Sequence, residues 1–218
     1  MNSAQEMHEA IRRGDLDHVR ALLDTEPGLL KGGGSSGMPP LMFAVYSRQM
    51  AIADLLIERG ADLDLFAAAA LGRLDVVKEE LGKNPLNLQA YSSDGWTPLH
   101  LASFFGAKDC AEYLIELGAS AKVRSANTMC NMPLHAAAAG RFFDIVALLL
   151  SNGAEVDAKQ HGGYTAMHSA AANGDIEVVR LLLAHQAQSG LRAENGKSPL
   201  DMAKDKEHTA VIELLGGM

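Results

Sequence analysis

Three histidines at regular intervals are the first candidates for chemistry. His100, His135 and His168 are separated by 35 and 33 residues. Imidazole is a common metal ligand, so this pattern suggests a row of ligands. If each histidine belongs to a separate packed unit, however, neighbouring rings lie about 10 Å apart, whereas a zinc–nitrogen bond measures about 2 Å. The spacing therefore favours a structural role, and we predict no metal site.

A column of acidic residues is interpreted in the same way. Each member lies at the start of a separate predicted helix, where negative charge stabilises the helix dipole, so we expect no catalytic pair of carboxylates. Cys110 lies early in one of these helices, a place that can lower a thiol pKa, but the sequence fixes no histidine beside it. The acidic column consists of Asp17, Asp75, Asp109, Asp144 and Glu177.

A glycine-rich stretch at residues 31–37 invites a phosphate-binding interpretation. Phosphate-binding loops of the common type continue into Gly-Lys-Ser/Thr, whereas Met38-Pro39-Pro40 follows here. We therefore interpret the stretch as a flexible loop. With no reactive group of residues left, we predict no catalytic residue, no cofactor and no enzymatic activity.

The elements that position these side chains are repeated. One tetrapeptide occurs at residues 97–100, 132–135, 165–168 and 198–201, and its second residue recurs at intervals of 35, 33 and 33. In the first copy Thr97 is placed to cap a helix and Pro98 to occupy its first turn. Gly106 then ends this short helix. A second helix with apolar residues at 3–4 spacing follows, so each repeat predicts a helix pair.

These signatures resemble the ankyrin repeat, with its Thr-Pro-Leu-His, Gly-x-x-Glu-Val-Val and Gly-Ala motifs. The resemblance implies an all-α solenoid of about seven stacked helix-turn-helix units with short β-hairpin-type loops, which we call fingers. In this family the motif histidine generally hydrogen-bonds its own and the neighbouring turn. We predict a single ankyrin-repeat domain over residues 1–218, with units at about 5–31, 39–61, 63–88, 96–118, 131–153, 164–186 and 197–216.

Two junctions depart from the period. Leu65 follows Pro40 by 25 residues instead of 33, so the third unit has no room for a finger. The loop Lys122–Asn131 is instead two residues longer than its counterpart. The terminal units are rich in charged residues, as the ends of a solenoid require for solubility.

Composition and charge limit the kind of core, the class of partner and the cellular location that we expect. Hydrophobic residues make up 48% of the chain and aromatic residues only 5%, which predicts an aliphatic core between closely packed helices. The net charge of −8 argues against nucleic acid. The chain has no apolar run long enough for a membrane helix and no signal-peptide pattern at its start. Its two cysteines need not pair, so we expect the reducing cytoplasm as its location. We also expect a monomer.

The resemblance also indicates which residues face the concave side: those on the fingers and those that end the inner helices. Aromatic residues there are unusual and are typical of binding surfaces. Inner packing remains the alternative for Trp96 and Phe104, whereas we expect Phe105, Tyr164 and Asn173 to be exposed. Two side chains, Arg124 and His161, are expected to orient a partner from the rim. The candidate binding residues are Trp96, Phe104, Phe105, Arg124, Asn131, His161, Tyr164 and Asn173.

The function predicted from these observations is a non-catalytic scaffold or adaptor that binds another protein in the concave groove and on the fingers. The alternative is a small-molecule or peptide sensor that uses the irregular loop 122–131. An enclosed cavity at that loop would favour the sensor, and a shallow groove would favour the scaffold.

Overall fold

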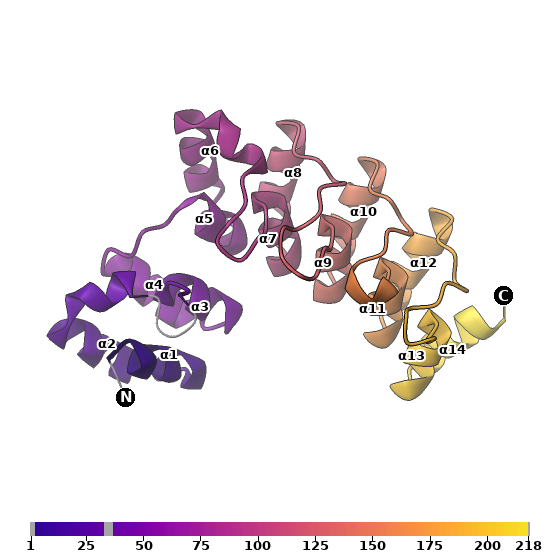
Figure 1. Cartoon of the computed structure of the whole chain (residues 1–218), viewed down its shortest axis with the longest axis horizontal. Helices are drawn as coiled ribbons and strands as arrows, with labels where there is room; N and C mark the ends of the chain where they lie inside the picture. Colours follow the sequence, from indigo (N-terminus) through magenta and orange to yellow (C-terminus); the bar gives the residue numbers. More distant parts are fainter. Residues whose placement is uncertain (1–2, 33–36, 218) are drawn as a thin grey trace.

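The chain folds into pairs of antiparallel helices that stack side by side (Figure 1). The computed structural model describes residues 3–32 and 37–217, and within these ranges it contains fourteen α-helices and no strand. Each of the seven predicted units contains one pair. The inner helices are α1 (Ser3–Arg13), α3 (Pro40–Tyr46), α5 (Leu65–Leu71), α7 (Pro98–Phe105), α9 (Pro133–Gly140), α11 (Ala166–Ala172) and α13 (Pro199–Asp205). The outer helices are α2 (Leu16–Thr25), α4 (Met50–Glu58), α6 (Leu74–Lys83), α8 (Lys108–Glu116), α10 (Phe143–Ser151), α12 (Ile176–Ala184) and α14 (Thr209–Gly216).

The turn between the two helices of a unit uses one left-handed residue. Glycine holds this place in four units because it adopts positive φ without a steric penalty. Three units place a larger residue there and tolerate the strain. The residues at this turn are Gly14, Arg48, Gly72, Gly106, Arg141, Gly174 and Glu207, and all seven have φ between 57° and 83°.

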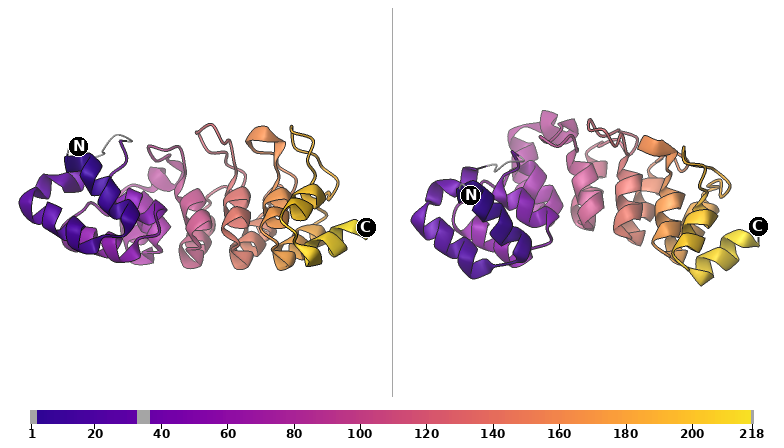
Figure 2. Two further views of the ribbon diagram at one scale, coloured as in Figure 1. Left: turned by 90° about the horizontal axis from the view of Figure 1, so that it is seen from below. Right: turned by 60° about the horizontal axis from the view of Figure 1, so that its bottom comes forward.

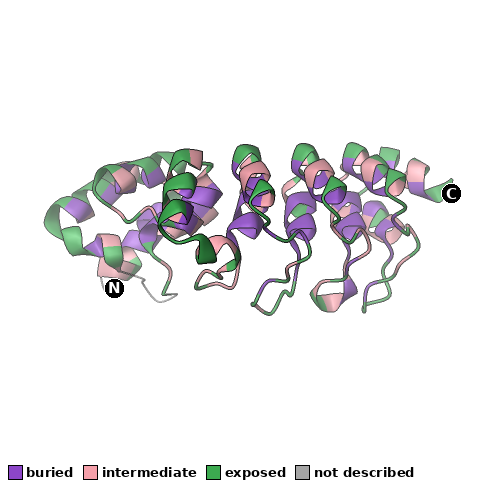
Figure 3. Ribbon diagram, turned by 90° about the horizontal axis from the view of Figure 1, so that it is seen from above, coloured by how far each residue is buried: buried purple, intermediate pink, exposed green. Residues whose placement is uncertain are grey.

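The core is aliphatic and lies between the two rows of helices (Figure 3). Alanines on the inner helices let neighbouring backbones approach closely, and leucines on the outer helices fill the second layer. In α9, for example, Ala136, Ala137 and Ala138 are all buried. The outward faces of the outer helices are exposed, as expected for an amphipathic helix pair.

The fingers project from one side of the stack (Figure 2). Each closes on itself through a backbone hydrogen bond, such as the 2.8 Å bond from Ser92 N to Trp96 O and the 2.9 Å bond from Gln160 N to Tyr164 O. These single bonds give the fingers a hairpin-like course without forming strands. The two segments of each finger are therefore held together mainly by the turn between them.

Neighbouring fingers are also joined to each other. The N–H groups of Ala126, His161 and Glu194 donate to carbonyl oxygens of the preceding finger, each at a distance of 2.8 Å. The acceptors belong to Gly95, Met129 and Gly162. One backbone bond between each successive pair holds the last four fingers as a row.

The shortened junction predicted between the second and third units is present. Asp64 directly caps α5, since its side chain accepts from Ala67 N at 2.8 Å, and no finger precedes it. In Figure 1 the helices α1–α4 turn away from the row formed by α6, α8, α10 and α12. The glycine-rich loop predicted nearby includes residues 33–36, which lie outside the described residues.

Gly106→Ala tests the packing of the inner turns. Gly106 has φ of +83°, and a Cβ there would lie 2.3 Å from Phe142 Cε1. We expect the free energy of unfolding to fall by about 3 kcal/mol, from backbone strain together with overpacking.

The matched control is Gly60→Ala, because Gly60 has φ of +91° and a Cβ there would meet no atom within 4 Å. This control should lose only the backbone part, about 1 kcal/mol. Urea unfolding of the two variants measures the difference, and equal losses would contradict the packing assigned to Phe142.

Candidate functional site

The motif histidine joins its own unit to the next finger. The ring of His100 accepts at Nδ1 from the backbone N–H of Thr97, 3.4 Å away, and its Nε2 lies 3.1 Å from Asn131 O. A backbone N–H can only donate and a carbonyl can only accept. The ring is therefore neutral with its proton on Nε2, and it links the cap of α7 to the base of the following finger.

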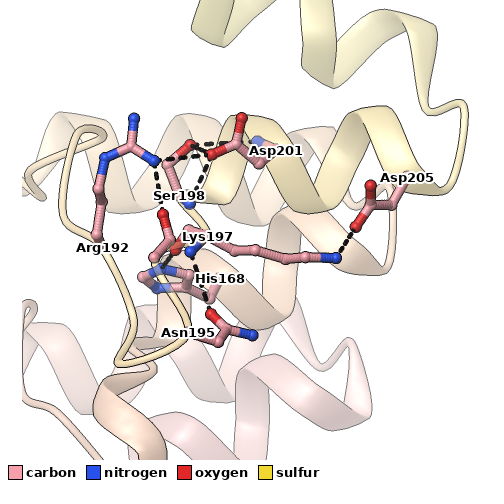
Figure 4. Close-up of polar contacts among 8 residues, drawn as sticks. His168, Arg192, Asn195, Lys197, Ser198, Asp201 and Asp205 are labelled. Carbon is pink, nitrogen blue, oxygen red and sulfur yellow. Dashed lines mark hydrogen bonds and ion pairs between the residues drawn. The ribbon is translucent and has the colours of Figure 1, made fainter.

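The same bridge recurs along the stack. His135 accepts from Met132 N at 3.1 Å and donates to Ala158 O at 2.8 Å. His168 accepts from Thr165 N at 3.1 Å, and its Nε2 lies 3.2 Å from Lys197 O (Figure 4). In the first unit, His8 Nε2 lies 3.1 Å from Met38 O.

Burial keeps these rings neutral. Loss of solvent lowers the pKa of His100 and of His135 to about 4, although the carbonyl bonds act in the opposite direction. The pKa of His168 is lowered for the same reason. Across residues 3–32 and 37–217, no three His, Cys, Asp or Glu side chains come together as a metal site. The geometry gives the histidines a structural role.

The last unit replaces the histidine with Asp201. Its carboxylate accepts from Ser198 N at 2.9 Å and from Ser198 Oγ at 2.7 Å, so it caps α13 as the rings cap α7, α9 and α11. Arg192 lies 3.1 Å from the same carboxylate (Figure 4). These hydrogen bonds lower the pKa of Asp201.

The stability of the chain should fall as the pH drops from about 6.5 towards 4. The folded pKa of His100 and of His135 lies below the unfolded value of 6.5, so their stabilising effect is complete above pH 6.5 and is lost as the unfolded state takes up protons. We expect a loss of about 2 kcal/mol for each ring between pH 7 and pH 5, measured by urea unfolding.

Two variants test whether the buried histidines cause this pH dependence of stability. His100→Gln should remove the part of about 2 kcal/mol that this ring contributes, whereas the same change at the exposed His185 should leave that part intact. An equal free energy of unfolding at pH 7 and pH 5 in the native chain would contradict the assignment.

Three of the predicted binding residues lie together in an aromatic cluster. The ring centroids of Trp96 and Phe104 are 5.2 Å apart, and those of Phe104 and Phe105 are 5.0 Å apart. All three rings are half-buried. A fourth member, Tyr46 of α3, lies 5.3 Å from Phe105. The cluster therefore joins the second unit to the fourth.

Three other predicted residues, His161, Tyr164 and Asn173, line a separate open groove of 390 Å³. Tyr164 is half-buried against His168 at a ring distance of 5.6 Å, and its hydroxyl accepts from Asn195 Nδ2 at 2.8 Å. Asn173 is also half-buried, and its amide donates to Ala138 O and Ala139 O. Phe105, Tyr164 and Asn173 were expected to be exposed, and each is half-buried because it also packs within the stack.

The remaining two predicted residues hold the fingers in place. The guanidinium of Arg124 donates to Cys130 O at 3.0 Å and to Lys159 O at 2.8 Å. Asn131 is only 6% exposed, and its backbone N–H donates to Ser125 Oγ at 3.1 Å. A partner on the surface would meet little of Asn131.

The extra length of loop 122–131 is used for contacts with both neighbours. Asn127 donates to Asp94 O at 2.9 Å in the finger before it, and Met129 O accepts from His161 N in the finger after it. Met129 lines the open groove of 390 Å³. The loop thus contributes to a shallow surface, which is the outcome that favours the scaffold over the sensor.

Cys110 is fully buried, and burial together with the charges of Asp109 and Asp75 raises its pKa to about 11. The helix-start effect considered from the sequence is outweighed, because the thiolate has no solvent around it. Cys110 is therefore a poor nucleophile.

Sequence reasoning missed Tyr46, Met129 and Met202. Tyr46 holds the same place in its unit as Phe104, two residues before the left-handed turn, so the rule used for the later units identifies it when extended to α3. Met129 and Met202 line the groove, and their contribution depends on how the fingers and α13 stack.

The comparisons agree with this architecture. The family model for ankyrin repeats in three copies matches residues 65–160 and 134–217, and the model for a single ankyrin repeat matches residues 36–66. These matches cover most of the chain, which therefore belongs to the ankyrin-repeat family.

Curated relatives differ in length and name. The probable 26S proteasome regulatory subunit p28 of Saccharomyces cerevisiae is 27% identical over 176 residues, which is 74% of this chain and 76% of p28. Human ankyrin repeat and SOCS box protein 18 is 28% identical over 71% of this chain and 40% of its own length. Glycerophosphocholine phosphodiesterase gde1 of Schizosaccharomyces pombe is 34% identical over 47% of this chain and 9% of its own length. Apart from p28, the chain spans between 8% and 40% of the relatives compared.

Proposed function

We propose that the chain is a non-catalytic protein-binding module whose partner lies in the groove of 390 Å³ between the last fingers and inner helices. This groove is the observation that carries the proposal. It is lined by apolar side chains and a few polar ones, a mixture suited to a protein surface. Tyr164, His161 and Asn173 supply the polar groups, and the methionines Met129 and Met202 supply adaptable apolar contact.

The rigidity of the groove supports the proposal. Backbone bonds between fingers and histidine bridges between units fix its walls before any partner arrives, so binding requires little further ordering. Half-buried Trp96, Phe104 and Phe105 form a second apolar surface, at α7 and the finger before it. The guanidinium of Arg124 and the backbone N–H of Asn131 bond within the fingers and so help to fix them.

The relatives fit a role in protein assembly. One is named as a proteasome subunit and another as a SOCS box protein. The match to gde1 covers only 9% of that enzyme, so it carries no activity over to this chain. None of the helices in the described ranges is long and apolar enough to cross a membrane. Cys110 and Cys130 are free thiols, as expected in a cytoplasmic setting.

Two new charges in the groove test the proposal. Met129→Glu with Ser169→Glu places carboxylates on the groove wall, and no side-chain hydrogen bond is lost with either residue. We expect the double variant to capture at least one partner protein at least tenfold less than the native chain does, because a buried unpaired charge opposes binding. Affinity purification from native lysate with quantitative mass spectrometry measures this, alongside the melting temperature.

The matched control is Met50→Glu with Leu86→Glu. These side chains are 43% and 86% exposed and lie away from the groove, and Met129 is also 43% exposed. The control should retain the partner. Retention of every captured protein by the groove variant would overturn the proposal.

A further inference from the structure

A cavity of 190 Å³ lies at the shortened junction, apart from the groove. Its apolar walls come from three parts of the chain: Met42 and Tyr46 of α3, Phe66 of α5, and Tyr91 on the finger that precedes α7. Tyr46 also belongs to the aromatic cluster, where its ring lies 5.3 Å from that of Phe105. This contact holds one wall of the cavity in place.

The absence of a finger explains why this space is open. In the regular units a motif histidine reaches from one inner helix to the next finger. Met42 takes the place of that histidine in the second unit and Ala67 takes it in the third. Neither side chain makes the bridge, and no finger stands between Asp62 and α5 to fill the gap.

The charges that line the cavity are all negative. Asp64 and Asp94 lie in its lining, and no Lys or Arg does. Neither carboxylate forms an ion pair with the described basic residues. Lys31 lines an adjoining cavity, which shares Asp64 with this one. Asp94 is half-buried, and its partial removal from water strengthens its attraction for a cation.

Both carboxylates are held in position. Asp94 accepts hydrogen bonds from the hydroxyls of Tyr46 and Ser92, and Asp64 accepts from Ala67 N at 2.8 Å. Each carboxylate has about four acceptor sites, so capacity remains for a ligand. Partial burial raises the pKa of Asp64, and the neighbouring charges of Asp62 and Glu80 add to this effect. A bound cation would offset the repulsion from Asp62 and Glu80.

We infer that this cavity binds a positively charged side chain, lysine or arginine, from a partner protein. Aromatic faces attract cations, and a charge-assisted hydrogen bond to a fixed carboxylate orients the head group. The net charge of −8 also favours a basic partner. The inference rests on the proposed protein-binding function for the source of the side chain, but the cavity itself can be tested without any partner.

The probes are N-acetyl-arginine amide and N-acetyl-lysine amide, titrated into the full ¹⁵N-labelled chain. We expect saturable shifts of the backbone amides of Phe66, Ser93 and Asp94 with at least one of them. N-acetyl-citrulline amide, which is similar in shape to the arginine probe but neutral, should cause none. Saturation by citrulline as strongly as by arginine, no saturation by either cationic probe, or saturation by calcium chloride alone would overturn the inference.

Asp64→Asn locates the charge that matters. Asparagine caps helices as well as aspartate, so the fold should persist while binding of the cationic probe weakens about fivefold. The matched control is Asp15→Asn, because Asp15 also caps a helix, by accepting from His18 N at 3.0 Å, but lies outside the cavity. Equal weakening in both variants would contradict a local site.

The groove variant separates the two proposals. Met129→Glu with Ser169→Glu leaves the cavity lining unchanged, so it should bind the cationic probe as the native chain does. Failure of the groove test with intact probe binding removes the groove proposal alone, and failure of probe binding removes the cavity inference alone.

Discussion

A neutral imidazole ring with one acceptor and one donor is the interaction on which the regular part of this stack depends. In His100 and His135 the acceptor nitrogen takes a backbone N–H at the start of the ring's own helix, and the donor nitrogen reaches a carbonyl of the next finger. The ring thereby fixes the distance between an inner helix and the following loop. Because a buried carbonyl must find a donor, loss of the ring would leave polar groups unsatisfied on both sides.

The groove is a consequence of this repeated bridge. Each histidine sets one finger, and backbone bonds between fingers align the row. Tyr164 can then stand over His168 and face the space between fingers and helices. Asp201 shows the same principle in the last described unit, because its carboxylate accepts hydrogen bonds from Ser198 at the start of α13 as the ring nitrogens accept at the start of their own helices.

The junction without a histidine bridge is held differently. Met42 and Ala67 cannot make the bond, and the chain there relies on rings and a hydroxyl: Tyr46 packs on Phe105 and donates to Asp94. Two units at the N-terminal end consequently turn away from the others, as Figure 1 shows. The same departure from the repeat creates the cavity lined by Asp64.

Much of the fold could be predicted because its determinants are local and recur. A capping residue, a proline in the first turn and a left-handed residue at the next turn specify a helix pair within one unit, and the period repeats it. Even the missing finger was evident from the interval between Pro40 and Leu65.

The site was harder to predict because it depends on contacts between units. Asn131 looked accessible by position, but its side chain is buried at the base of a finger. Arg124 is exposed, as a rim charge would be, and its guanidinium also bonds carbonyls of two fingers, a contact that no local sequence pattern indicates. The partnership of Tyr46 with Asp94 joins residues 48 apart and arises only because a finger is absent between them.

The tautomer of the motif histidines tests the central claim most directly. Two-bond ¹H–¹⁵N correlation spectra of the ¹⁵N-labelled chain at pH 6 distinguish the two neutral tautomers from the imidazolium ion. We predict that His100 and His135 are neutral, with the proton on Nε2. A proton on Nδ1, or a charged ring at pH 6, would contradict the bridge and the architecture derived from it.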